Sequence, residues 1–79
     1  MKLPSDMDAA QLIKALGCLG YFETRQTASH VRLQCAEPLH LITIPNHRPI
    51  KIGTLSAILN DLAKVLGVNR DELLVKLFG

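Results

Sequence analysis

The chain has 79 residues and a formal net charge of +2, with 48% hydrophobic and 20% charged residues. This length suffices for one domain, and the composition excludes wholesale disorder. A weakly basic balance admits nucleic acid as a partner without requiring it.

The first element predicted along the chain is a helix over residues 5–20. Ser5 is a suitable N-cap for it, and acidic residues follow in the first turn. Gly20 is the expected end. Hydrophobic residues recur at helical spacing and form one apolar stripe: Ala9, Leu12, Ile13, Leu16 and Leu19.

Three strands are predicted next, over residues 21–26, 30–35 and 39–44, joined by short turns as an antiparallel meander. The second strand alternates regularly, which predicts two faces. One face carries Val31, Leu33 and Cys35, and the other carries His30, Arg32 and Gln34. Strict alternation in the first strand places Arg25 on the side of Tyr21 and Glu23, and its distance from His30 depends on a register that the sequence leaves open.

Two further helices are predicted over residues 54–67 and 69–79. Thr54 is the expected N-cap of the first, and Gly67 its end. Asn69 with Glu72 has the spacing of a capping box. We expect the two amphipathic helices to cover one sheet face and leave the other open. The last helix is expected to cover a sheet edge or to serve a dimer contact.

Several motifs together resemble one known family. They are "LIKAL" in the first helix, "GY" and "RQ" in the first strand, "SH" at 29–30, "IPNH" at 44–47 and "IKIGTLSAIL" at 50–59. In this order and spacing the chain resembles the HicA, or YcfA-type, toxins of bacterial toxin–antitoxin pairs. The resemblance covers about residues 5–67, so we expect a single domain over 1–79 with an extra C-terminal helix at 68–79.

The resemblance implies an α+β fold like the double-stranded-RNA-binding domain, with a three-stranded antiparallel meander sheet and helices on one face. It also implies a metal-independent endoribonuclease that cleaves mRNA and is neutralised by a HicB-type antitoxin. The family's catalytic histidine falls on His30. One position departs from the family, which usually has glycine where this chain has Ala28. A glycine needed there for a positive φ would leave alanine strained.

The residues suggest a compatible chemistry on their own. RNA carries its nucleophile, the 2′-hydroxyl, so an enzyme must deprotonate it and stabilise the charged phosphorane. Histidine suits the first task as a general base, and cations suit the second. His30 is the candidate base. The candidate RNA-binding residues are Arg25, Ser29, Arg32, His47, Arg48 and Lys51. Ser29 is expected to be a turn residue rather than a nucleophile, because no acid orients a Ser-His pair here.

No metal site and no cofactor are predicted. The spacing of His30, His40 and His47 matches no standard zinc pattern. His40 is expected only to begin the third strand. Cys18 and Cys35 form no CxxC motif, so both are expected to be small apolar fillers in a reducing cytoplasm. No run approaches the length of a membrane span, and no membrane partner is expected.

Two other functions remain open from the sequence. One is a non-catalytic RNA-binding or adaptor domain of the same fold. The other is a DNA-binding helix-turn-helix with "NRDELLVKLF" as recognition helix, although Asp71 and Glu72 near its start would repel the DNA backbone. The expected partners are mainly single-stranded mRNA and an antitoxin, and the sequence leaves a homo-oligomer open.

Overall fold

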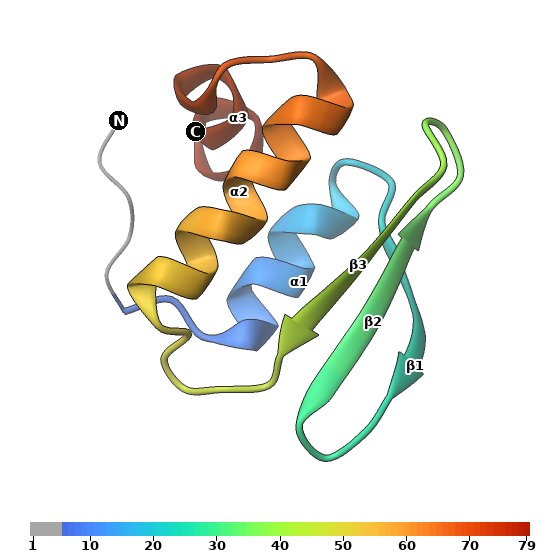
Figure 1. Ribbon diagram of the computed structural model, residues 1–79, viewed down its shortest axis with the longest axis vertical. Helices are drawn as coiled ribbons and strands as arrows, with labels where there is room; N and C mark the ends of the chain where they lie inside the picture. The colour runs from blue at the N-terminus through green and yellow to red at the C-terminus, as the bar shows by residue number, and fades with distance from the viewer. Residues whose placement is uncertain (1–5) are drawn as a thin grey trace.

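The computed structural model describes residues 6–79, in the order helix, three strands and two helices (Figure 1). The elements are α1 (Ala9–Gly17), β1 (Phe22–Gln26), β2 (His30–Cys35), β3 (His40–Pro45), α2 (Ile52–Leu66) and α3 (Arg70–Phe78). This order confirms the predicted α+β architecture, which is consistent with a fold like the double-stranded-RNA-binding domain. In the described part of the chain, no helix has the length and apolar character needed to cross a membrane.

The helix α1 is shorter than predicted and begins with a different cap. Ser5 lies outside the described residues, and the N-cap is Asp8 instead. The Asp8 carboxylate accepts from the Gln11 backbone N–H, while the Gln11 side chain accepts from the Asp8 N–H. This reciprocal capping box satisfies two backbone donors at once, which explains why the helix starts here. It ends at Gly17, and Gly20 lies beyond it in a turn with a φ of 92°.

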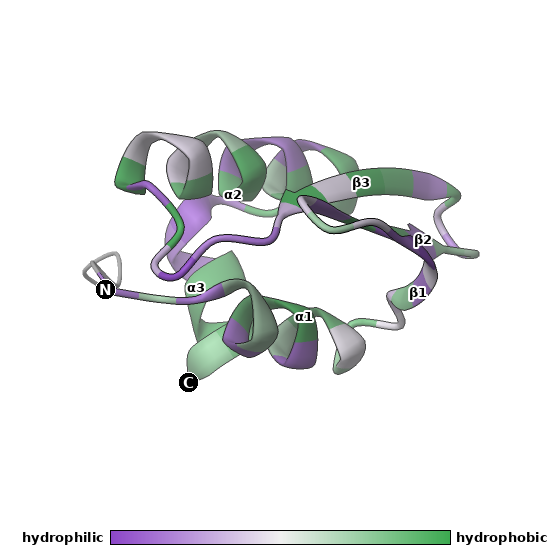
Figure 2. Cartoon of the chain, turned by 90° about the horizontal axis from the view of Figure 1, so that it is seen from below, coloured by the Kyte–Doolittle hydropathy of each residue, from purple (hydrophilic) through white to green (hydrophobic). Residues whose placement is uncertain are grey.

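The three strands form an antiparallel meander in the order β1-β2-β3, as predicted. The two faces of β2 are also as predicted, with Val31, Leu33 and Cys35 buried and His30 and Arg32 exposed. In β3 the buried residues Ile42 and Ile44 stand opposite Leu33 and Val31. Figure 2 shows the three helices to one side of the sheet, so the opposite face is uncovered. We call it the open face.

The helix α2 begins at Ile52, two residues before the predicted N-cap Thr54. Its cap position is Lys51, which makes no side-chain capping bond. The chain is already held there, because Ile50 is buried and its N–H donates to the Met7 carbonyl. That anchor orients the chain into the helix, so Thr54 lies within the first turn. At the other end, Gly67 adopts the left-handed conformation with a φ of 68°, as a C-terminal glycine is expected to do.

The helix α3 packs against α2 and α1, rather than along a sheet edge as one prediction had it (Figure 1). The predicted capping box of Asn69 and Glu72 is present. Arg70 donates to Ser56 Oγ and Asn60 Oδ1 on α2. The apolar side of α3 is buried, through Leu73, Leu74 and Leu77. The exposed side of α3 begins with Asp71 and Glu72, and acidic groups there would repel a DNA backbone.

The two cysteines have different environments. Cys35 is buried on the helix side of the sheet, as predicted for an apolar filler. Cys18 is exposed, so the same prediction is wrong for it. It follows the last residue of α1 at the C-cap, where the chain turns toward β1 and leaves the core.

Candidate active site on the open sheet face

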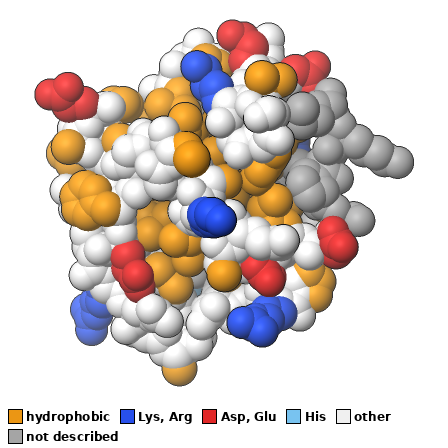
Figure 3. Space-filling model, turned by 180° about the vertical axis from the view of Figure 1, so that it is seen from behind, with side chains coloured by type: hydrophobic (Ala, Val, Ile, Leu, Met, Phe, Trp, Pro, Cys, Tyr) orange, Lys and Arg blue, Asp and Glu red, His pale blue; other side chains and the backbone are white. Residues whose placement is uncertain are grey.

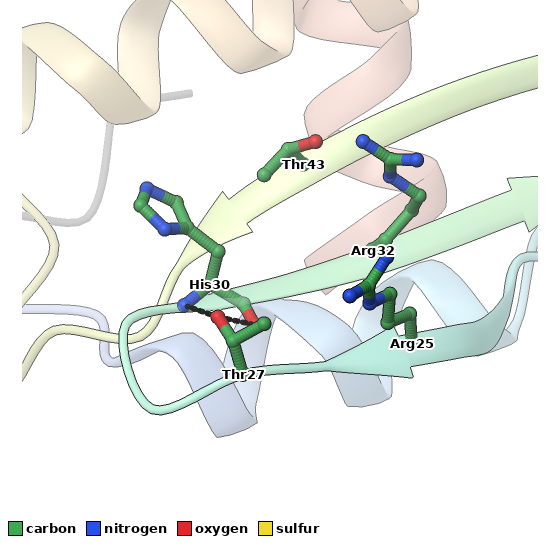
Figure 4. A pocket seen from close by; sticks show the side chains of 5 residues that line it. All are labelled: Arg25, Thr27, His30, Arg32 and Thr43. Carbon is green, nitrogen blue, oxygen red and sulfur yellow. Dashed lines mark hydrogen bonds between the residues drawn. The ribbon is translucent and has the colours of Figure 1, made fainter.

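A hollow of about 400 Å³ lies on the open face at the β1–β2 turn. It is lined by Arg25, Thr27, His30, Arg32 and Thr43. Figure 4 shows the His30 ring and the Arg32 guanidinium projecting from β2, with Thr43 between them on β3 and Arg25 on the neighbouring strand. Three predicted site residues, His30, Arg25 and Arg32, therefore line one hollow.

A β-bulge in β1 brings Arg25 to this face. Glu23 pairs with Leu33, but Arg25 pairs with Arg32, so Thr24 is an extra residue in the ladder. The Thr24 hydroxyl lies 3.4 Å from the Arg32 carbonyl oxygen to which it donates. Strict alternation would have placed Arg25 on the side of Tyr21 and Glu23, and that prediction is wrong because the bulge shifts the phase by one residue.

The turn before β2 holds His30 by its backbone. The Thr27 N–H donates to the His30 carbonyl over 2.8 Å, and the His30 N–H donates to Thr27 Oγ1 over 3.2 Å. The Ser29 hydroxyl lies 2.9 Å from His30 Nδ1, so one ring nitrogen is engaged and Nε2 is left for a ligand. Among residues 6–79 no non-glycine residue has a positive φ. Ala28 is therefore accommodated without backbone strain.

The open face near the hollow is positively charged. Arg25 and Arg32 are exposed, and neither forms an ion pair with another residue in the described part of the chain. The residues that the register places on this face include no acid: Phe22, Arg25, His30, Arg32, Gln34, Leu41, Thr43 and Pro45. By contrast, Figure 3 shows the rear of the molecule, where basic and acidic side chains are scattered singly among hydrophobic ones. Unpaired cations favour an anionic ligand on the open face.

The other predicted RNA-binding residues lie on the loop between β3 and α2. His47, Arg48 and Lys51 are exposed there, and none of them lines the hollow. The loop is fastened beside the turn, because the Asn46 N–H donates to the Ser29 carbonyl over 2.8 Å. The His47 carbonyl accepts from the Ala9 N–H at the start of α1. The loop that carries these three residues thus begins beside the turn that holds His30.

Sequence reasoning missed Thr27 and Thr43 as lining residues. Thr43 lies on the open face because it pairs directly with Arg32. The alternation of β3 signals this position, since the buried Ile42 and Ile44 flank it. Thr27 lies in the turn before β2, and its signal is the ability of a threonine hydroxyl to bond the backbone nearby.

His40 does more than begin β3, since it lies between two polar partners. Its Nε2 is 3.0 Å from Asp61 Oδ2 on α2, and its Nδ1 is 2.7 Å from the Tyr21 hydroxyl. Because the carboxylate only accepts, Nε2–H donates to it, and Nδ1 forms the second hydrogen bond, with the Tyr21 hydroxyl. This chain joins β3 to α2 and to the residue before β1. It lies at the end of the sheet away from His30, so we assign it to structure.

Burial of Tyr21, followed by the negative charges of Cys35 and Asp61, raises the pKa of its phenol from 10 to about 12. The folded state therefore holds this proton more tightly than the unfolded state, and stability falls as pH rises from 10 to 12. We expect the free energy of unfolding to drop by about 1–2 kcal/mol more in the native chain than in Tyr21→Phe. Urea unfolding at pH 9 and pH 11.5 measures this, and parallel losses in both proteins would contradict it.

The described residues contain no group of three or more histidine, cysteine or acidic side chains that could hold a metal ion. What the hollow does combine is an exposed imidazole with one free nitrogen, two unpaired guanidinium groups and two hydroxyls. An imidazole can accept a proton, and guanidinium groups can bind phosphate oxygens in a bidentate manner. This set suits proton abstraction next to a phosphodiester.

A protein-family model, described as the HicA toxin of bacterial toxin-antitoxin systems, matches residues 9–64. This range covers more than half of the chain and runs from α1 almost to the end of α2. No curated protein and no solved structure matches the chain.

Proposed function

Since the chain belongs to the HicA toxin family of bacterial toxin–antitoxin systems, we propose that it is an endoribonuclease that cleaves mRNA with His30 as general base. The observation that carries this proposal is the hollow in which His30 stands beside Arg25 and Arg32 on an open face without acids. Family membership supplies the toxin context, and the hollow supplies the chemistry.

The proposed first step is removal of the 2′-hydroxyl proton by His30. Nε2 must be unprotonated for this, so the ring proton is on Nδ1. Nδ1–H then donates a hydrogen bond to Ser29 Oγ over 2.9 Å. Ser29 is then a positioning residue that holds the ring orientation through this contact. This role agrees with the expectation that it is not a nucleophile.

The 2′-oxygen then attacks the adjacent phosphorus, and the bond to the 5′-oxygen breaks. The 2′-hydroxyl proton passes to Nε2, and the departing 5′-oxygen takes a proton from water in this exposed hollow. Negative charge grows on the phosphate oxygens during the attack. Arg25 and Arg32 stabilise it, because cations placed where charge develops lower the barrier. The products carry a 2′,3′-cyclic phosphate and a 5′-hydroxyl, and no step requires a metal ion.

The proposed substrate is single-stranded mRNA. The open face offers few cations to the phosphates of the RNA backbone, so RNA binding should be weak and should decline as the salt concentration rises. His47, Arg48 and Lys51 contribute further phosphate contacts from the neighbouring loop. A HicB-type antitoxin is the proposed partner that keeps the activity in check. Acidic groups from such a partner would meet the unpaired Arg25 and Arg32 and cover the hollow.

The test is cleavage of one sequence as single-stranded RNA and as DNA by the purified chain, with and without EDTA. We expect RNA to be cut in both conditions, with cyclic phosphate ends, and DNA to stay intact because it lacks the 2′-hydroxyl. A HicB-type antitoxin that binds this chain should suppress cleavage in the same assay. RNA binding without any cleavage would favour the alternative, a non-catalytic RNA-binding domain of the same fold.

A further inference from the structure

A second group of side chains on the open face has no role in the proposed chemistry. Phe22 pairs with Gln34, and Gln34 pairs with Leu41, so the three form one row across β1, β2 and β3. Phe22 is 50% exposed and Leu41 57%, and Gln34 between them is half-buried. We call these three residues the cross-strand row.

Phe22 lies on an edge strand that covers no core, because all five residues of β1 are exposed. The register places the apolar Phe22 on the open face and the charged Glu23 on the helix side, opposite the buried Leu33. Burial in the core therefore does not account for the ring of Phe22, which is available to a ligand on the open face.

The cross-strand row continues directly from the hollow. Arg32 stands between His30 and Gln34 on β2, and Arg25 lies on β1 between the turn and Phe22. Gln34 lies four positions along the strand from His30, which is about 13 Å. A strand of RNA bound with one phosphate in the hollow can therefore follow the arginines to the row.

We propose that the cross-strand row is a subsite for one unpaired base of the RNA strand whose scissile phosphate occupies the hollow; this inference rests on the proposed function. Exposed aromatic rings on a sheet stack single-stranded bases, and an amide can donate to and accept from a base edge. Phe22 stacks the base, Gln34 contacts its edge, and Leu41 closes the other side.

A nucleotide suits this row better than a protein partner does. A stable protein interface takes about 20–30 residues from each side. The row offers one ring, one leucine and one amide, which matches the size of a base. The neighbouring unpaired arginines supply the positive charge that a nucleotide phosphate needs. The subsite would set a preference for one base at a fixed distance from the cleaved bond.

The experiment measures RNA binding apart from cleavage. The full chain with His30→Ala is titrated into fluorescein-labelled single-stranded RNA, and anisotropy reports the dissociation constant. Adding Phe22→Ala should weaken binding about 5- to 100-fold, the range for loss of one stacked base. Phe22→Trp should retain affinity, which shows that the ring and not the fold is measured. Val75→Ala, an exposed apolar control on α3, should leave affinity unchanged.

A set of RNAs that each lack one base then locates the contact. One abasic position should weaken binding to the His30→Ala protein but have no further effect once Phe22 is alanine. Equal binding by the phenylalanine and alanine proteins would overturn the subsite, and so would an abasic effect that is the same in both. A Phe22→Ala protein that binds RNA normally but changes from dimer to monomer in light scattering would also overturn it. If the native chain cleaves RNA but Phe22→Ala does not weaken RNA binding, the subsite is wrong and the proposed function still holds.

Discussion

His30→Ala is expected to slow RNA cleavage by about 10²- to 10⁴-fold, the usual contribution of one general base. The imidazole is exposed, and within residues 6–79 its side-chain hydrogen bond is to the adjacent Ser29, so the fold should not change. Without it, only water can accept the 2′-hydroxyl proton. The measurement is the single-turnover rate constant at saturating RNA, with circular dichroism and thermal unfolding to show that the variant is folded.

The matched control for this variant is His47→Ala. His47 is also an exposed histidine, but it lies on the loop outside the hollow. Its loss should weaken RNA binding without changing the rate constant at saturation. Equal rate constants for the native chain and His30→Ala would place the base elsewhere. Equal losses from both histidine variants would point to general electrostatics instead of proton transfer.

The second large effect concerns stability. Leu33 is fully buried at the centre of β2, on the face that meets the helices. Leu33→Ala should lower the free energy of unfolding by about 2–5 kcal/mol, because the cavity adds to the lost burial. A domain of this size has roughly 4–12 kcal/mol in total, so this is a large share of its stability. Urea unfolding monitored by circular dichroism measures the change.

Leu39→Ala is the matched control for the stability prediction. It removes the same atoms from a side chain that is 74% exposed, so its effect should stay within about 0.5 kcal/mol. Cleavage activity also distinguishes the stability variant Leu33→Ala from the catalytic variant His30→Ala. A stabilising osmolyte should restore cleavage by Leu33→Ala, because the site itself is intact. The same osmolyte should not rescue His30→Ala, and rescue of both would contradict a catalytic role for the histidine.

Local patterns predicted most of the fold. The alternation of residues 30–35 identified both faces of β2, and the spacing of Asn69 and Glu72 identified the start of α3. Two helix starts were missed because other contacts decide them. Asp8 forms a reciprocal box with Gln11, and the backbone of Ile50 is anchored to that of Met7. The box of Asp8 and Gln11 is itself a local pattern, which the prediction of Ser5 overlooked. The bond between Ile50 and Met7 joins residues far apart in the chain, so no local pattern contains a sign of it.

The part of the site that lies on one strand was predictable from alternation. The part that comes together through the pairing of neighbouring strands was not. His30 and Arg32 share a face by simple alternation. Arg25 and Thr43 join them only through the registers of β1 and β3, which the sequence does not specify. The Tyr21–His40–Asp61 chain was missed for the same reason, since its members come from three separate segments.

The bulge at Thr24 also has a consequence for comparing sequences. Side chains three positions apart in an ordinary strand point to opposite faces, yet Phe22 and Arg25 share the open face. The residues of the open face on β1 and β2 therefore have an irregular spacing in the sequence, F-x-x-R-x-x-x-x-H-x-R-x-Q over residues 22–34. The interval from Phe22 to Arg25 is odd, whereas the two intervals after His30 are even. A search for equivalent surfaces that assumes uniform spacing would overlook them, whereas one that allows a single extra residue before the arginine would find them.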